Sequence, residues 1–145
     1  MHAMNNREDL VDRLVATHGE QGVCPTASDW HAILGRKGAI HLLNLLKFRP
    51  SVDTDVGPVS GAEAYARYSS GVADVFAGVG GQRIFRGRIE HIFSTGAVPG
   101  WDAAVVTRYP SAEALAQMWL DPRFVAAHDN RVNGVERSQV FVFGG

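Results

Sequence analysis

Apolar residues near the start of the chain recur at helical spacing. Between Asn5 and His18 the apolar side chains occupy one face and charged side chains the other, which is typical of an amphipathic helix. In the stretch PTASDWHAIL, Thr26 and Asp29 have the spacing of a capping box and predict a short second helix that ends before Gly35. Residues 1–38 are therefore predicted to form a helical extension in front of the main domain.

From Ala39 onward, strand-length apolar segments alternate with helix-length ones. The predicted elements are a buried strand at Ala39 to Phe48, a helix that Ser60 and Glu63 cap and that ends near Gly78, a long strand at Gln82 to Thr95, a strand at Trp101 to Tyr109, a helix that begins at Ser111 and restarts at Asp121 and Pro122, and a strand at Ser138 to Phe143. Gly87 is a candidate bulge. RPSVDTDVGPV is predicted to be an irregular connection and GAVPG a turn between antiparallel strands.

The order of these elements predicts the fold. Strand, helix, strand, strand, helix, strand is the split βαβ arrangement of ferredoxin-like α+β proteins, with a four-stranded antiparallel sheet and the helices on one face. The other face would carry apolar residues in at least the first and last strands, and it needs a cover. The simplest cover is a second copy, so a symmetric homodimer with two sheets face to face, a dimeric α+β barrel, is expected over residues 39–145.

Composition narrows the possible functions. The chain has 145 residues, of which 46% are hydrophobic and 20% charged, values that suit one soluble domain. A net charge of −1 gives no field for collecting nucleic acid or anionic lipid, so neither partner is expected. No signal peptide or membrane-spanning stretch is apparent, and the single cysteine, Cys24, suits a reducing compartment. A cytoplasmic location is the expectation.

Several short motifs, taken in order, resemble a known family. They are NLLKFR, EAYARY, GG, RGR, WDAAVVTRYPS, DPRF and HDNRV. Over Ala39 to Phe143 the chain resembles the DUF1330 family of dimeric α+β barrel proteins, and the preceding residues resemble the extension of its longer members. The resemblance implies a ferredoxin-like homodimer in a cytoplasmic bacterial setting, without an established reaction. Arg88 stands where many members carry a second glycine.

Three arginines and a histidine form the first candidate site. Arg131 and His128 are predicted on the last helix, with Arg108 and Arg86 on two adjacent strands. Two guanidinium groups and an imidazole suit a carboxylate or enolate, because arginine binds such groups bidentately and histidine exchanges protons near neutrality. The alternative is structural: Arg131 and Arg108 would pair with Asp129, Asp102 or Glu136, and His128 would be a core histidine.

Asn44 is the second candidate, because it interrupts an otherwise apolar strand. A buried amide without partners costs on the order of 1 to 3 kcal/mol, so its position needs a reason. It would either orient a ligand, together with Tyr65, or satisfy backbone groups at a sheet edge or dimer seam. Tyr65 and Tyr68 could equally be packing residues.

A third hypothesis involves heme. Asn44, Trp119 and His128 are similar in type and order to residues that surround heme in the heme-degrading monooxygenases of the same barrel superfamily. Neutral imidazole is a suitable proximal iron ligand. The interval from Trp119 to His128 is one residue shorter than in that pattern, and the prediction without cofactor is preferred.

Other chemistries find little support. The six histidines show no metal-ligand spacing, and the glycines from Gly78 to Gly81 follow a helix and predict a turn instead of a phosphate cradle. RGRIEHIF lacks the stacking aromatics of RNA-recognition modules. The sequence therefore predicts a homodimer that binds a small acidic or carbonyl-bearing metabolite, with cofactor-independent catalysis, heme binding and a purely structural dimer as open alternatives.

Overall fold

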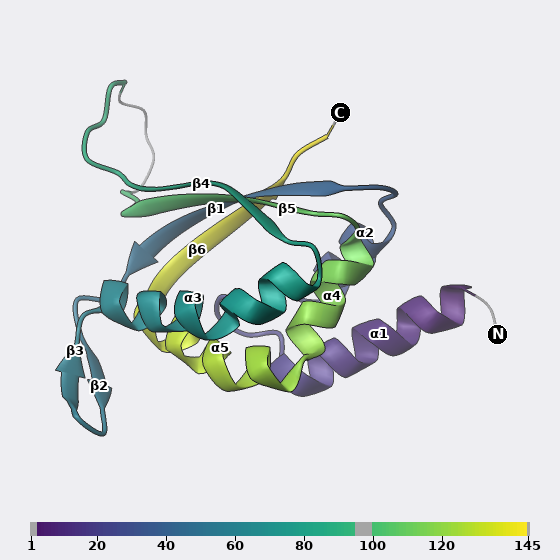
Figure 1. Cartoon of the computed structure of the whole chain (residues 1–145), viewed down its shortest axis with the longest axis horizontal. Coiled ribbons are helices and arrows are strands. Elements are labelled where there is room, and N and C mark those ends of the chain that lie inside the picture. Colours follow the sequence, from purple (N-terminus) through teal and green to yellow (C-terminus); the bar gives the residue numbers. More distant parts are fainter. Residues whose placement is uncertain (1–2, 95–99, 145) are drawn as a thin grey trace.

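The computed structural model describes residues 3–94 and 100–144 (Figure 1). The helices are α1 (Ala3–His18), α2 (Ala27–Leu34), α3 (Gly61–Gly78), α4 (Ala112–Leu120) and α5 (Pro122–Gly134). The strands are β1 (Ile40–Phe48), β2 (Val52–Thr54), β3 (Gly57–Val59), β4 (Gln82–Arg88), β5 (Ala103–Tyr109) and β6 (Val135–Val142). None of the described helices combines the length and apolar character needed to cross a bilayer.

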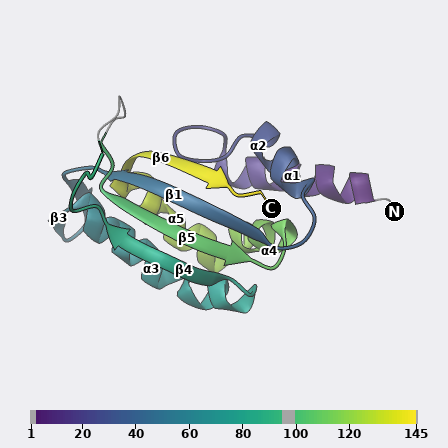
Figure 2. The same ribbon diagram turned by 90° about the horizontal axis from the view of Figure 1, so that it is seen from above.

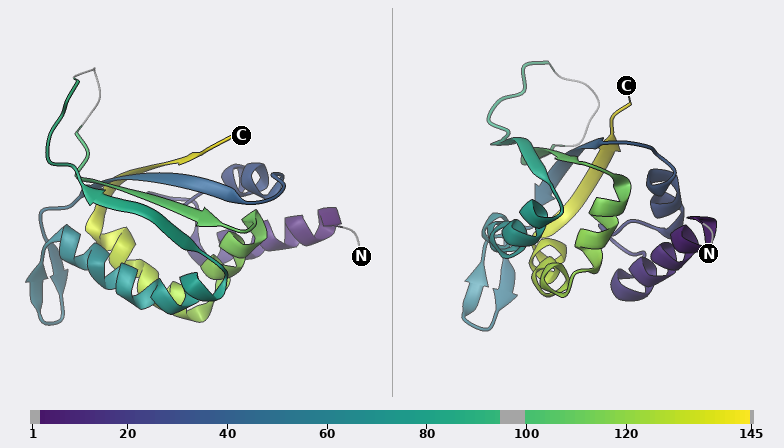
Figure 3. Two further views of the ribbon diagram at one scale, coloured as in Figure 1. Left: turned by 45° about the horizontal axis from the view of Figure 1, so that its top comes forward. Right: turned by 45° about the vertical axis from the view of Figure 1, so that its right-hand side comes forward.

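Four strands form one antiparallel sheet in the order β4-β5-β1-β6. Along the chain, α3 connects β1 to β4, and α4 and α5 connect β5 to β6. Together with the strand order, this is the predicted ferredoxin-like topology. All the long helices lie on one side of the sheet and leave the other side open (Figures 1 and 3). The predicted fold class is confirmed.

Local capping residues explain where the helices begin. Thr26 and Asp29 form the predicted capping box of α2. The Ser60 hydroxyl accepts from the Glu63 N–H, so α3 has the predicted N-cap without the reciprocal bond of a full box. Asp121 ends α4 and caps α5, with Pro122 as the first residue of α5. The predicted break in the second crossover is therefore confirmed.

The N-terminal extension packs into the same core as the sheet. Leu14 of α1 and Trp30 of α2 join a buried cluster that also contains Leu42 of β1 and Trp119 of α4. The His18 ring, at the end of α1, donates from Nε2 to the Trp119 carbonyl at 2.7 Å. Figure 2 shows α1 and α2 beside the end of the sheet where β6 lies.

Three local predictions were wrong. RPSVDTDVGPV contains a small hairpin, β2 and β3, closed at Gly57, which has a φ of +106°. β4 ends at Arg88, well before Thr95: Arg88 pairs with Ala103 at the start of β5, and one more backbone bond follows, from the Ile89 N–H to the Asp102 carbonyl. The bulge lies between Arg83 and Phe85, not at Gly87. Most of the predicted GAVPG turn lies outside the described residues.

The sheet has two unlike faces. On the open face, Phe85, Val106, Leu43 and Phe141 stand opposite one another and form an apolar row across all four strands, here called the outer row. On the helix side, the row beside it is Arg86, Val105, Asn44 and Val140. Successive residues of a strand point to opposite faces, so the same strands serve both rows.

Candidate functional site

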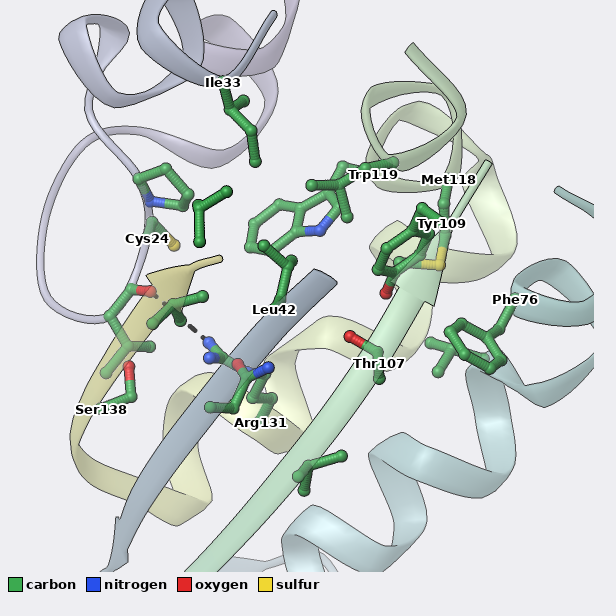
Figure 4. Close-up of a pocket in the computed structure, with 18 of the residues that line it drawn as sticks. Cys24, Ile33, Leu42, Phe76, Thr107, Tyr109, Met118, Trp119, Arg131 and Ser138 are labelled. Carbon is green, nitrogen blue, oxygen red and sulfur yellow. Dashed lines mark hydrogen bonds between the residues drawn. The ribbon is translucent and has the colours of Figure 1, made fainter. Parts of the chain in front are cut away.

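A cavity of about 800 Å³ lies between the helix side of the sheet and the helices. The strands β1, β4, β5 and β6 form its floor, α3, α4 and α5 its roof, and residues of the N-terminal extension close one side. Figure 4 shows side chains from the extension, from β1, β5 and β6, and from the three helices, with Arg131 between the strands and the extension. Its size is that of a pocket for a small organic molecule.

Arg131 is the most informative side chain of the cavity. It is only 4% exposed, yet it makes none of the ion pairs formed among the described residues. Its Nη1 donates to the Val23 carbonyl at 3.5 Å, a long contact. A buried guanidinium without a carboxylate is costly, because its charge has lost water and gained no counter-charge. An anion in the cavity would supply this counter-charge.

The structural alternative for Arg131 does not occur in the described part of the chain. Asp102, one of its expected partners, instead pairs with Lys47 at 3.4 Å and accepts from the Phe48 N–H at 2.7 Å. This contact ties the end of β1 to the start of β5, away from the arginine. The carboxylate that could have neutralised Arg131 is thus used to hold the sheet together.

Two further arginines reach the cavity from the edge strand. Arg86 donates to the Ser69 hydroxyl at 3.1 Å, and its guanidinium lies 5.4 Å from the centre of the Tyr65 ring. Arg83 lines the same cavity and was not predicted. The bulge in β4 is the reason, because it places two residues three apart on one face of the strand. Regular alternation would have turned Arg83 away.

Asn44 and Tyr65, which the pocket hypothesis named, also line the cavity, as does Trp119 from the heme hypothesis. Asn44 is half-buried in the middle of β1, on the helix side. Burial raises the pKa of Tyr65, while the charges of Arg131, Arg86 and Arg83 act to lower it. The phenol is a neutral hydrogen-bond donor near neutrality, placed within reach of three cationic side chains.

The extension supplies a wall that sequence reasoning did not anticipate. Cys24, Trp30 and Ile33 all line the cavity, and the Val23 carbonyl is the acceptor for Arg131. Burial raises the pKa of the Cys24 thiol, with Arg131 opposing that shift. The thiol is thus protonated near neutrality and suits a packing role better than a nucleophilic one. No local pattern in residues 1–38 indicates which part of the main domain they cover.

Two of the predicted site residues are absent from the cavity lining. Arg108 alternates with Thr107 and Tyr109, which do line it, so its side chain belongs to the open face of β5. His128 is 3% exposed and its ring packs against those of His18, Tyr68, Trp119 and Phe124. Burial, with Arg131 and His18 nearby, lowers the pKa of His128 to about 3.

The heme hypothesis requires Asn44, Trp119 and His128 around one space. Asn44 and Trp119 line the cavity, whereas the His128 ring is enclosed by aromatic side chains and its Nε2 is buried without a partner. An iron ligand must present its nitrogen to the macrocycle, and this imidazole does not. The arrangement of these residues therefore does not fit a heme. Nor do the described residues contain a group of three or more side chains suited to a metal ion.

Comparison with protein families decides the relationship. The family model "Domain of unknown function (DUF1330)" matches residues 55–145. This chain belongs to the DUF1330 family. The match begins after β1, so the DUF1330 region proper contributes Arg131, Arg86 and Tyr65 to the cavity, whereas Asn44 and Cys24 come from residues that precede it.

Solved structures extend the likeness of this DUF1330 protein beyond the family match. A protein of unknown function from Rhodopseudomonas palustris is 30% identical, with a TM-score of 0.76 over 86% of this chain and 96% of that one. A dimeric protein of unknown function with a ferredoxin-like fold, from Bacteroides fragilis, is 16% identical, with a TM-score of 0.50 over 74% of this chain and 96% of that one. Comparison with curated proteins finds no match.

Proposed function

We propose that this DUF1330 protein binds a small organic acid with an apolar body, and that Arg131 binds its carboxylate. The observation that carries the proposal is a guanidinium that is buried in a cavity and makes no ion pair among the described residues. A carboxylate would supply the missing counter-charge and could accept two parallel N–H bonds from the arginine.

The remaining lining supports the apolar body of such a ligand. Trp30, Leu42, Met118 and Trp119 surround the space near Arg131, and Figure 4 shows the last three around it. Burial of apolar ligand surface against such side chains contributes roughly 25 cal/mol per Å². Asn44 can orient a ligand carbonyl because its amide carries both donors and an acceptor. A proton-transfer role for His128 is not part of the proposal, since its imidazole lies outside the lining.

The experiment is a binding titration with short carboxylic acids, from acetate to hexanoate and phenylacetate. Binding should raise the melting temperature by mass action and slow the alkylation of Cys24, which is the chain's only cysteine and lies in the cavity wall. Affinity should rise with the apolar area of the acid.

Arg131→Met is the informative variant, and Arg67→Met is its control on the exposed side of α3. Loss of a charge-assisted contact should weaken binding by about 30-fold or more in Arg131→Met. Arg67→Met should bind as the parent does. Equal affinity in the parent and Arg131→Met would contradict the assignment.

A second proposal concerns the open face of the sheet: we propose that two copies associate through the outer row. Phe85 is 59% exposed and Phe141 41% exposed, and Leu43 and Val106 lie between them. A contiguous apolar row of this kind is unusual on a monomer's surface and favours an interface. The row is continuous across the sheet, so a second copy related by a twofold axis would place its outer row against this one.

Sedimentation equilibrium should give twice the chain mass at micromolar concentration, and a monomer at every concentration would contradict this proposal.

A further inference from the structure

The bulge in β4 concentrates positive charge at one end of the cavity. It places Arg83 opposite Thr107 and Arg86 opposite Val105, and both of these partners face the helix side. Arg83 and Arg86 therefore point to the same side of the edge strand. In a regular strand, two residues three positions apart would point to opposite sides. The bulge thus adds the guanidinium of Arg83 to that of Arg86 on the β4 side of the cavity.

These arginines lie apart from Arg131. Arg86 is in the same cross-strand row as Asn44 and two strands away, which places their backbones about 10 Å apart. Arg131 comes from α5, and its guanidinium contacts the Val23 carbonyl of the extension. Arg86 lies instead beside α3, where it contacts the Tyr65 ring and the Ser69 hydroxyl. The cavity therefore has one cationic group on the β4 side, next to α3, and another beside the extension.

No carboxylate among the described residues neutralises the charge at either end, where Arg131 is buried and Arg83 and Arg86 are exposed. The ion pairs that the described residues form include neither Arg83, Arg86 nor Arg131. The one acidic residue in the lining, Asp29, accepts from the Thr26 N–H as part of the α2 capping box. A ligand with one carboxylate would neutralise Arg131 and leave the β4 arginines without a counter-charge. A second carboxylate would supply that counter-charge and offset the repulsion between the two β4 arginines.

We propose that the cavity has two anion subsites, Arg131 at one end and Arg83 with Arg86 at the other, and that its ligand is a dicarboxylate. This inference rests on the proposed function, because it extends the ligand that Arg131 binds. The apolar side chains between the subsites contact the carbon chain of the ligand.

Hexanoate and hexanedioate are the matched probes, because they differ only in the second carboxylate. The parent protein should bind hexanedioate about tenfold more tightly than hexanoate at low ionic strength, as expected for one added charge-assisted contact at a partly exposed site. Calorimetric titration of both acids measures this ratio, and added salt should reduce it.

Arg83→Gln combined with Arg86→Gln should abolish the preference for hexanedioate over hexanoate. Arg88→Gln is the control, because Arg88 lies on the same strand, pairs with Glu90 at 3.3 Å and is not part of this cavity's lining. Arg131→Met should weaken both acids.

Three results would overturn the inference. If hexanoate binds through Arg131 and hexanedioate binds no better, the second subsite is wrong while the proposed function stands. A preference that persists in the variant lacking Arg83 and Arg86 would also reject these residues. If neither acid, nor any acid of the earlier panel, binds the parent protein, the proposed function and the second subsite both fail.

Discussion

The two faces of the β4-β5-β1-β6 sheet both carry apolar residues, but only the covered face combines them with polar side chains around a cavity. The face beneath the helices carries Arg83, Arg86 and Asn44 beside its apolar residues, and the face without helices carries the outer row of Phe85, Val106, Leu43 and Phe141. In an ordinary two-layer protein the covered face is the apolar one. Here the covered face is partly polar because it encloses a cavity.

This difference separates two tasks that the same strands perform. Arg131 is buried beneath the roof, where a bound anion interacts with it more strongly than it would in water, whereas Arg83 and Arg86 remain exposed on the edge strand. Apolar groups on an open face gain only when a surface of similar character covers them. We therefore assign ligand binding to the covered face and association of two chains to the open one. A variant on one face should change only the property assigned to that face, so the property assigned to the other face serves as the control.

The largest effect is expected from a charge placed in the outer row. Phe141→Glu should weaken association of two chains by about 100-fold or more, because it removes an apolar contact and adds a charge that dimerisation would bury. Sedimentation equilibrium measures the change. Val132→Glu is the matched control: Val132 is 37% exposed, close to the value of 41% for Phe141, but lies on α5. If Phe141→Glu binds hexanoate normally and still sediments as the parent does, the open face has no role in association.

Acid is expected to weaken the helical layer through His128. Its pKa is lowered from 6.5 to about 3 in the folded state, so between these values the unfolded chain binds the extra proton. Stability from this group is complete above pH 6.5 and is lost as the pH falls toward 3, about 2 kcal/mol by pH 5. The titratable neighbours of the ring are Arg131 on its own helix, His18 on α1 and Tyr68 on α3.

Urea unfolding of the parent and of His128→Asn at pH 7 and pH 5 measures this effect. The variant should lose less stability on acidification, whereas His31→Asn, at an exposed histidine on α2, should behave as the parent does. Identical losses in the parent and His128→Asn would show that the buried imidazole does not set the acid response.

The smallest effect is expected at the contact between two roof helices. A Cβ added at Gly71 of α3 would lie 2.8 Å from the Ala127 Cβ of α5. Gly71→Ala should lower the free energy of unfolding by about 1 kcal/mol, the strain exceeding the gain in helix propensity. Gly78→Ala, where nothing lies within 4 Å, should not be destabilising. Denaturant unfolding compares them, and a more stable Gly71→Ala protein would mean that the roof relaxes freely.

Gly71→Ala also tests whether the two faces are independent. The variant should alter hexanoate binding, because α3 carries Tyr65 and Ser69 of the lining, but it should associate as the parent does. A matching loss of association would show that the roof and the open face are coupled through the sheet.

Local signals predicted most of the elements because they act over a few residues. The capping box at Thr26 and the proline after Asp121 fix the starts of α2 and α5 through hydrogen bonds and backbone angles within one turn. Prediction failed for strands whose length or existence depends on pairing with another strand. β4 is short because β5 begins at Ala103, and the hairpin of β2 and β3 forms within a segment whose composition suggested only a loop.

The same distinction explains the candidate site. Arg131, Arg86, Asn44, Tyr65 and Trp119 interrupt or extend periodic patterns and could be selected from them, and all five line the cavity. Arg108 was expected in the site, but the regular alternation of β5 gives the helix side to Thr107 and Tyr109 instead. Arg83 was not predicted, because its face depends on the register of β4. A bulge of one residue changes that register without any change in composition.

By itself, the sequence determined the order of strands and helices, the helix boundaries and the family, since these depend on spacing and short motifs. The tertiary structure alone decided three things: that residues between Gly22 and Arg36 form a wall of the cavity, that Arg131 is buried with no carboxylate partner among the described residues, and that His128 is enclosed by aromatic rings. Each of these depends on side chains brought together from distant parts of the chain. Their environment is set by packing, which no local pattern encodes.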